Sequence, residues 1–141
     1  MSRVCLDASV WVKVLTEEPG TYAAQELVLR LLREQKEIIA PPIMKIEVGS
    51  VLRKKWSRRM LDSEMLQELW RKFASLPIKY VVDRRQDELA WEIADANRLI
   101  HLYDAVYLAV SDGIDYWTAD ARLVHSVRQS RARIRLLEAD R

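Results

Sequence analysis

The sequence predicts an α/β domain whose mainly parallel sheet is flanked by helices on both faces. The order of the segments along the chain supports this fold class. Short apolar runs, each about the length of a β-strand, alternate with longer segments that have a helical pattern. This alternation is typical of strand–helix–strand units and therefore of parallel pairing. The 141 residues fit one compact domain, taken as residues 1–141, and show no repeat, low-complexity tract or linker.

Five apolar runs are expected to form the strands of this sheet. Val4-Cys5-Leu6 is apolar at every position, a pattern typical of a strand that is buried on both faces. The remaining runs are shorter than helices usually are and are separated by helical segments. The expected strands are residues 4–6, 38–40, 78–82, 116–118 and 134–137.

Seven segments between and beside these strands are expected to be helical. Pro41-Pro42 marks one change from strand to helix, because proline fits the first position of a helix. Ser9 is the residue expected to cap the first helix. The expected helices are residues 10–15, 21–34, 42–56, 62–75, 86–98, 104–112 and 121–130.

The composition excludes several other classes of protein. The chain is 50% hydrophobic and 31% charged, which excludes a disordered chain. No apolar run approaches the roughly 20 residues of a membrane span, and the first residues lack a signal-peptide pattern, so a cytoplasmic location is expected. The single cysteine, Cys5, excludes an internal disulfide and a cysteine-based zinc site, and is expected to be a small core residue.

Four acidic residues stand in apolar surroundings where an isolated charge would be costly. Asp7 directly follows the buried strand at residues 4–6, and Asp104 is the only charge within residues 102–110. Glu47 lies on the same helical face as Ile43 and Val51, about 40° from each on a helical wheel. Asp120 lies between the strand at residues 116–118 and the next helix.

Each acid also has a structural explanation that the sequence leaves open. An aspartate at the start of a helix caps it, which applies to Asp7, Asp104 and Asp120. Glu47 can extend along the edge of the apolar face and reach water with its carboxylate. The four positions nevertheless share one feature, since each follows a strand or lies near the beginning of a helix. Such positions meet at one edge of an α/β sheet, where ligands usually bind.

Carboxylates gathered at one edge predict a site for a divalent cation. Two carboxylates about 4 Å apart repel by about 4 kcal/mol at a protein surface, and raised pKa values or a bound cation relieve this repulsion. Hard oxygen ligands favour Mg²⁺ or Mn²⁺ over zinc. His101 and His125 are far apart in the sequence and are expected to be surface or structural residues.

Two clusters of basic residues are candidates for binding an anionic polymer. Neutralising phosphates releases counterions, so such clusters suit nucleic acids, although a solvated helix face has the same composition. Trp56, within the first cluster, is expected either to stack on a base or to pack against the next helix. The first cluster consists of Arg53, Lys54, Lys55, Arg58 and Arg59; the second consists of Arg122, Arg128, Arg131, Arg133 and Arg135.

Four groups of short motifs occur in order along almost the whole chain. They are Val4-Cys5-Leu6-Asp7-Ala8-Ser9, Ala40-Pro41-Pro42 with Glu47-Val48, Tyr103-Asp104-Ala105 with Tyr107-Leu108-Ala109, and Thr118-Ala119-Asp120. Together these motifs resemble the PIN domain, especially the VapC-type toxins of toxin–antitoxin systems. The resemblance implies a five-stranded sheet in the order 3-2-1-4-5 with Asp7, Glu47, Asp104 and Asp120 as catalytic and metal-binding residues. One departure is Ser50, where many relatives have asparagine.

The resemblance also implies an activity and partners. The expected activity is that of an Mg²⁺- or Mn²⁺-dependent endoribonuclease toxin, which hydrolyses RNA with a metal-activated water. A cognate antitoxin and a homodimer are the implied partners, and Ser9 and Thr118 are the implied hydroxyl partners of the acids. The expected RNA contacts are Arg53, Lys54, Lys55 and Arg58.

Three alternatives remain at the level of the sequence. The first is an RNA-processing nuclease of the same fold without an antitoxin, and the second is an inactive binding module. The third is a phospho-receiver domain, which usually needs an adjacent acid pair after the first strand and a lysine after the last. Here Asp7 stands alone and the last strand leads to Glu138, so this alternative is disfavoured.

Overall fold

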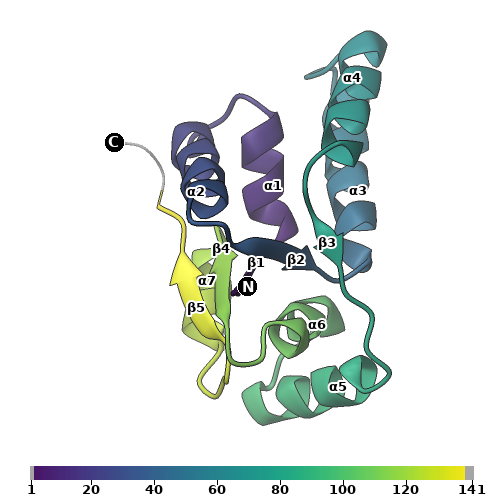
Figure 1. The fold of residues 1–141 in the computed structure, drawn as a ribbon. Helices are drawn as coiled ribbons and strands as arrows, with labels where there is room; N and C mark the ends of the chain where they lie inside the picture. Colours follow the sequence, from purple (N-terminus) through teal and green to yellow (C-terminus); the bar gives the residue numbers. More distant parts are fainter. Residues whose placement is uncertain (1, 139–141) are drawn as a thin grey trace.

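Within residues 2–138, which the computed structural model describes, five parallel strands form one sheet (Figure 1). Their order is β3-β2-β1-β4-β5, and each neighbouring pair is parallel. The predicted fold class and strand order are therefore confirmed. The strands are β1 (Arg3–Leu6), β2 (Glu37–Ala40), β3 (Lys79–Tyr80), β4 (Asp115–Thr118) and β5 (Arg133–Leu136).

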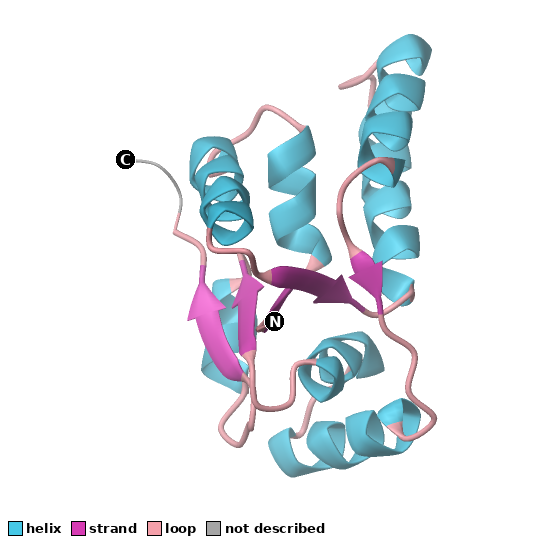
Figure 2. Cartoon of the chain, in the orientation of Figure 1, coloured by secondary structure: helices cyan, strands magenta, loops and turns pink. Residues whose placement is uncertain are grey.

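Helices flank the sheet on both sides. Figure 2 shows them in cyan around the magenta strands, and Figure 1 identifies α1 and α2 on one side and α5 and α6 on the other. The helix α3 packs against both α1 and α4. The helices are α1 (Ala8–Leu15), α2 (Thr21–Arg33), α3 (Ile43–Ser57), α4 (Ser63–Ala74), α5 (Gln86–Asn97), α6 (Leu102–Val110) and α7 (Ala121–Ser126).

The core is built on β1, β2 and α1, whose apolar side chains are almost completely buried. Trp11 and Leu6 are fully enclosed, as is Cys5, whose pKa burial raises to about 12. The expectation that Cys5 is a core residue is confirmed. Among the described helices, none has the length and apolar character needed to cross a membrane.

The cap of α1 differs from the expectation. Asp7, not Ser9, is the N-cap residue, and its carboxylate accepts a hydrogen bond from the backbone N–H of Val10 at 3.3 Å. Ser9 lies inside the helix and donates its hydroxyl hydrogen to Asp7. The prediction was wrong because β1 ends immediately before Asp7, whose extended backbone suits the cap position.

Three other elements have a boundary that differs from the predicted one by two residues or more. β3 is shorter than residues 78–82, since its partner β2 ends before Pro41, which has no backbone N–H for the ladder. α6 begins at Leu102, so Asp104 lies in its first turn and is not its cap. α7 ends at Ser126 instead of residue 130, because Asn97 Oδ1 accepts hydrogen bonds from the backbone N–H groups of Arg128 and Gln129.

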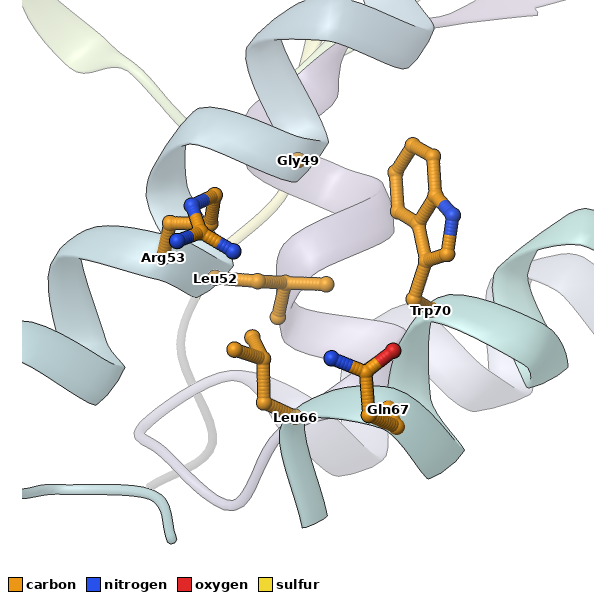
Figure 3. Close-up of a pocket in the computed structure, with 6 residues that line it drawn as sticks. All are labelled: Gly49, Leu52, Arg53, Leu66, Gln67 and Trp70. Atoms are coloured by element: carbon orange, nitrogen blue, oxygen red, sulfur yellow. The ribbon is translucent and has the colours of Figure 1, made fainter. Parts of the chain in front are cut away.

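A small cavity between α3 and α4 lies apart from the four acids. Gly49 permits the close approach of the two helices, because a Cβ atom there would lie 3.0 Å from the ring of Trp70. Figure 3 shows the six residues that line this cavity, of which Arg53 alone is charged. The cavity has a volume of about 220 Å³, and it is lined by Gly49, Leu52, Arg53, Leu66, Gln67 and Trp70.

Candidate active site

The carboxylate of Asp7 is fixed at the carboxyl end of the central strand β1. Its backbone N–H donates to the carbonyl oxygen of Trp117 at 3.0 Å, which holds the residue against β4. One carboxylate oxygen accepts hydrogen bonds from the hydroxyl of Ser9 and the backbone N–H of Val10, and the other accepts from the hydroxyl of Tyr116 at 3.0 Å. Asp7 is therefore oriented by donors from both β4 and its own helix.

Burial raises the pKa of Asp7 above its ordinary value. The hydroxyl groups of Ser9, Thr118 and Tyr116 and the N–H of Val10 lower this pKa, but their combined effect is smaller than that of burial. A buried carboxylate whose pKa remains raised is one that its protein donors stabilise incompletely. A cation at this position would complete the stabilisation.

Glu47 reaches the same region from α3. The hydroxyl of Tyr107 donates to Glu47 Oε1 at 2.8 Å, and this bond joins α3 to α6. Burial raises the pKa of Glu47, and the charges of Asp7 and Asp104 raise it further, whereas the bond from Tyr107 lowers it. The charges of Asp7 and Asp104 therefore act directly on Glu47.

Asp104 and Asp120 are the other two members of the acidic group, a name used here for Asp7, Glu47, Asp104 and Asp120. Burial raises the pKa of Asp104, and the charges of Asp120 and Asp7 add to this effect, while His101 opposes it. Asp120 caps α7 by accepting a hydrogen bond from the N–H of Arg122 at 3.0 Å, and its own N–H donates to the Thr118 hydroxyl. Asp120 therefore caps α7 and also acts electrostatically on Asp104.

Sequence reasoning missed two tyrosines that hold the acids in place. Tyr107 bonds to Glu47 and Tyr116 bonds to Asp7, and their ring centroids lie 5.9 Å apart. A signal existed for Tyr107, which follows Asp104 by three residues and so lies on the same face of α6. His101 was expected to be a surface or structural residue; it is exposed, yet it acts electrostatically on Asp104.

The donor set of the acidic group fits a hydrated Mg²⁺ or Mn²⁺ ion. Within residues 2–138, no group of three or more Asp, Glu, His or Cys side chains is arranged so that it could hold a metal ion by itself. Mg²⁺ does not require such a group, since it retains several waters and is commonly bound through one or two carboxylates. The hard oxygen ligands and the raised pKa values of Asp7, Glu47 and Asp104 both suit such an ion.

Some residues of the first basic cluster contact other side chains, and the others are exposed to solvent. Lys55 forms an ion pair with Glu18 at 3.2 Å, and it lines a cavity that also contains Glu47 and Asp120. The Arg53 guanidinium lies 5.1 Å from the ring centroid of Trp56, whose Nε1 donates to the hydroxyl of Ser63 on α4. Trp56 thus contacts the start of the next helix but remains 37% exposed, so the choice between packing and base stacking stays a prediction. Lys54, Arg58 and Arg59 are exposed.

Comparison with known proteins identifies the class to which this fold and this acidic group belong. The sequence profile of the PIN domain matches residues 4–129, which is most of the chain. The chain therefore belongs to the PIN domain family, as the motifs of its sequence indicated. A comparison with curated protein sequences gives no significant match.

Several solved structures share this fold. A chain of VapBC2 from Rickettsia felis, in a complex bound to a DNA fragment from its promoter, has a TM-score of 0.66 at 15% identity, covering 98% of this chain and 99% of its own. PAE2754 from Pyrobaculum aerophilum has a TM-score of 0.61 at 23% identity, covering 94% and 90%. VapC20 from Mycobacterium tuberculosis, a toxin that cleaves the sarcin–ricin loop, has a TM-score of 0.61 at 17% identity, covering 87% and 94%.

Proposed function

We propose that this protein is an Mg²⁺- or Mn²⁺-dependent endoribonuclease and the toxin of a toxin–antitoxin pair. The observation that carries the proposal is the electrostatic interaction among Asp7, Glu47, Asp104 and Asp120, which come from four different segments of a PIN-family fold. Burial raises the pKa values of Asp7, Glu47 and Asp104, and repulsion by neighbouring acids adds to this effect at Glu47 and Asp104, as expected for a site completed by a cation. VapC20, described as an RNA-cleaving toxin, shares the fold and so supports the assignment to toxins.

In this proposal, each acid has a role that follows from its surroundings. Asp7 and Glu47 are held by tyrosine hydroxyls at 3.0 and 2.8 Å, so their remaining lone pairs have a fixed direction. Asp104 lies in the first turn of α6 and Asp120 caps α7. The Ser9 hydroxyl donates to the Asp7 carboxylate, and the Thr118 hydroxyl accepts from the backbone N–H of Asp120. A divalent cation, when bound, supplies the positive charge that activates water and stabilises the leaving oxygen.

Arg53, Lys54, Lys55 and Arg58 are proposed to hold the RNA backbone beside the acids. All four follow Glu47 on the same helix or directly after it, so they lead from the acidic group toward the end of α3. An acidic site repels phosphate unless neighbouring cations offset the repulsion. A cognate antitoxin that blocks the site, a homodimeric state and a cytoplasmic location are parts of the same proposal.

An RNA cleavage assay tests the proposal. Cellular RNA is incubated with the protein and Mg²⁺, and the new 5′ and 3′ ends are mapped. We expect cleavage that EDTA prevents and that is lost in Asp7→Asn. Asp62→Asn is a matched control, because Asp62 also caps a helix through its carboxylate, but at α4.

Other outcomes would contradict the proposal. Cleavage that resists EDTA, or that is equal in Asp7→Asn and the wild type, would exclude the acids as the metal site. Binding of RNA without cleavage would indicate a binding module with the same fold. Cleavage without growth inhibition in cells would favour an RNA-processing nuclease over a toxin.

A further inference from the structure

Beside the four acids lies a cluster in which two lysines share one glutamate. Glu18 Oε1 lies 3.2 Å from Lys13 Nζ, and Glu18 Oε2 lies 3.2 Å from Lys55 Nζ. The three side chains are only 19–22% exposed, so each is largely removed from water. Burial works to raise the pKa of Glu18, but the two lysines and Thr16 hold it below its ordinary value. The cluster therefore has two cations for one anion and an excess of one positive charge.

Lys13 is held in place before any ligand arrives. Its Nζ donates to the carbonyl oxygen of Pro19 at 2.8 Å in addition to its ion pair with Glu18. Its aliphatic part lies against Gly20, where a Cβ atom would come within 3.0 Å of Lys13 Cδ. Gly20 also has a φ of 94°, which favours glycine. The loop after α1 thus fixes the ammonium group, and a fixed group loses little conformational entropy when it binds.

The cluster shares a cavity with two of the acids. Lys13, Glu18 and Lys55 line the same cavity of about 530 Å³ as Glu47 and Asp120. One part of this cavity is negative and the other carries the excess positive charge. A polyanion with regularly spaced charges fits such a division, since one phosphate can lie near the acids and their cation and a neighbouring phosphate near the lysines.

We propose that Lys13 and Lys55 form a subsite for a phosphodiester group of RNA next to the one that is cleaved. The inference rests on the proposed function for the identity of the polymer. A structural tie between α1 and α3 is the competing explanation. The two explanations predict different effects on RNA affinity when the charge of Glu18 is removed. A structural tie needs Glu18 and Lys13 equally, whereas phosphate binding needs the lysines and is opposed by the charge of Glu18.

The chain contains a matched control cluster. Glu37 is shared by Arg3 at 2.8 Å and Lys79 at 3.7 Å, so this cluster also has two cations for one acid. It lies at the amino ends of β1, β2 and β3, on the opposite edge of the sheet from Asp7. Lys79→Gln therefore removes the same charge from the same kind of cluster, away from the acids.

The test is RNA affinity measured in EDTA, so that binding is separated from metal-dependent cleavage. The probe is a fluorescein-labelled single-stranded oligouridylate, and anisotropy gives its Kd at several salt concentrations. Lys13→Gln is expected to raise the Kd about tenfold and to reduce the slope of log K against log salt by about 0.7, the share of one neutralised phosphate in single strands. Lys79→Gln is expected to leave both within error of the wild type.

Glu18→Gln separates the two explanations. It removes the opposing charge, so we expect the same or a lower Kd for RNA, together with a lower melting temperature. A Kd that rises equally in Glu18→Gln and Lys13→Gln, or that rises as much in Lys79→Gln, would overturn the subsite. If Lys13→Gln fails to fold, Lys55→Gln at the end of α3 tests the same prediction, and Lys13→Arg should retain binding.

The result is distinguishable from the failure of the proposed function. If no RNA is cleaved but affinity still depends on Lys13 and not on Lys79, the subsite stands and the nuclease assignment fails. If RNA is cleaved with the same KM in Lys13→Gln as in the wild type, the nuclease assignment stands and the subsite is overturned.

Discussion

The two edges of the sheet carry similar charged residues in opposite arrangements. At the amino edge, each of the five strands begins with a charged residue, and the acids Glu37 and Asp115 pair with arginines at 2.8 and 2.7 Å. At the carboxyl edge, Asp7 and Glu47 accept hydrogen bonds from tyrosine hydroxyls, and the charges of neighbouring acids raise the pKa values of Glu47 and Asp104. One edge neutralises its acids with cations, and the other places acids against acids.

The two edges differ in what their charges contribute to stability. Exposed ion pairs such as those at the amino edge contribute about 0–1 kcal/mol each to stability. Unneutralised acids at the carboxyl edge oppose folding, because burial disfavours their charged forms. This unfavourable arrangement lies at the edge where ligands bind in such sheets, and it supports the proposed cation site.

The largest expected effect on RNA cleavage comes from removing an acid at the carboxyl edge, compared with removing one at the amino edge. Asp104→Asn should lower RNA cleavage at saturating Mg²⁺ by about 100-fold, the upper part of the loss typical at metal sites. It should leave the fold intact and raise the melting temperature without metal, because it removes a charge that repels Asp7, Glu47 and Asp120. Asp115→Asn, at the amino edge, should leave cleavage unchanged. Retention of more than about a tenth of wild-type turnover in Asp104→Asn would remove it from the metal site.

Metal binding should stabilise the folded state, and this stabilisation should depend on the acids of the carboxyl edge and not on those of the amino edge. Mg²⁺ or Mn²⁺ at about 100 times its Kd should stabilise the folded state by about 2.7 kcal/mol, measured as a rise in melting temperature. Asp7→Asn should abolish this rise, since asparagine retains the cap of α1 but loses the charge. In Asp115→Asn, the metal should raise the melting temperature as much as it does in the wild type. Equal rises in Asp7→Asn and the wild type would mean that the metal binds elsewhere.

The pH dependence of stability should reflect the raised pKa values. The pKa values of Asp7, Glu47 and Asp104 are above the ordinary values of 3.8, 4.5 and 3.8, so the folded state binds more protons than the unfolded chain. Their contribution to the stability of the folded state is fully present when the pH is below the ordinary pKa values, and it is lost as the pH rises through the folded pKa values. Without metal, lowering the pH from about 7 to about 5 should therefore raise the melting temperature of the wild type more than that of Asp104→Asn. An equal change in both proteins would contradict the prediction.

The smallest effect is expected from the exposed part of the first basic cluster. Replacing Lys54 and Arg58 with alanine should weaken RNA binding a few-fold and reduce the salt slope by up to about 0.7 for each phosphate that is no longer neutralised. Turnover at saturating RNA should remain close to that of the wild type. An unchanged salt slope would assign these residues to solvent or to a protein partner, and the arginines near β5 would become the better candidates. Those arginines are partly engaged, since Arg133 and Arg135 both lie within 4 Å of Asp115.

The strands and the four acids were predictable because their signals are local. Residues 4–6 are apolar on both faces, which requires a central strand, and Asp7 must then lie at its end. Glu47 lies among core residues one helical turn away on either side, which distinguishes it from a surface glutamate. Parallel strands bring their carboxyl ends to one edge, so positions far apart in sequence were expected to meet there.

What the sequence by itself determined is therefore the α/β class and the central strand, and it also supplied the four acids proposed for the site, since periodicity and burial depend on neighbouring residues. Only the tertiary structure decided which side chains serve those acids. Tyr107 and Tyr116 reach Glu47 and Asp7 across 60 and 109 residues, and Asn97 ends α7 from another helix. Such bonds depend on how α3, α6 and β4 are placed around β1, and hydrogen-bond geometry tolerates too little error for sequence spacing to specify it.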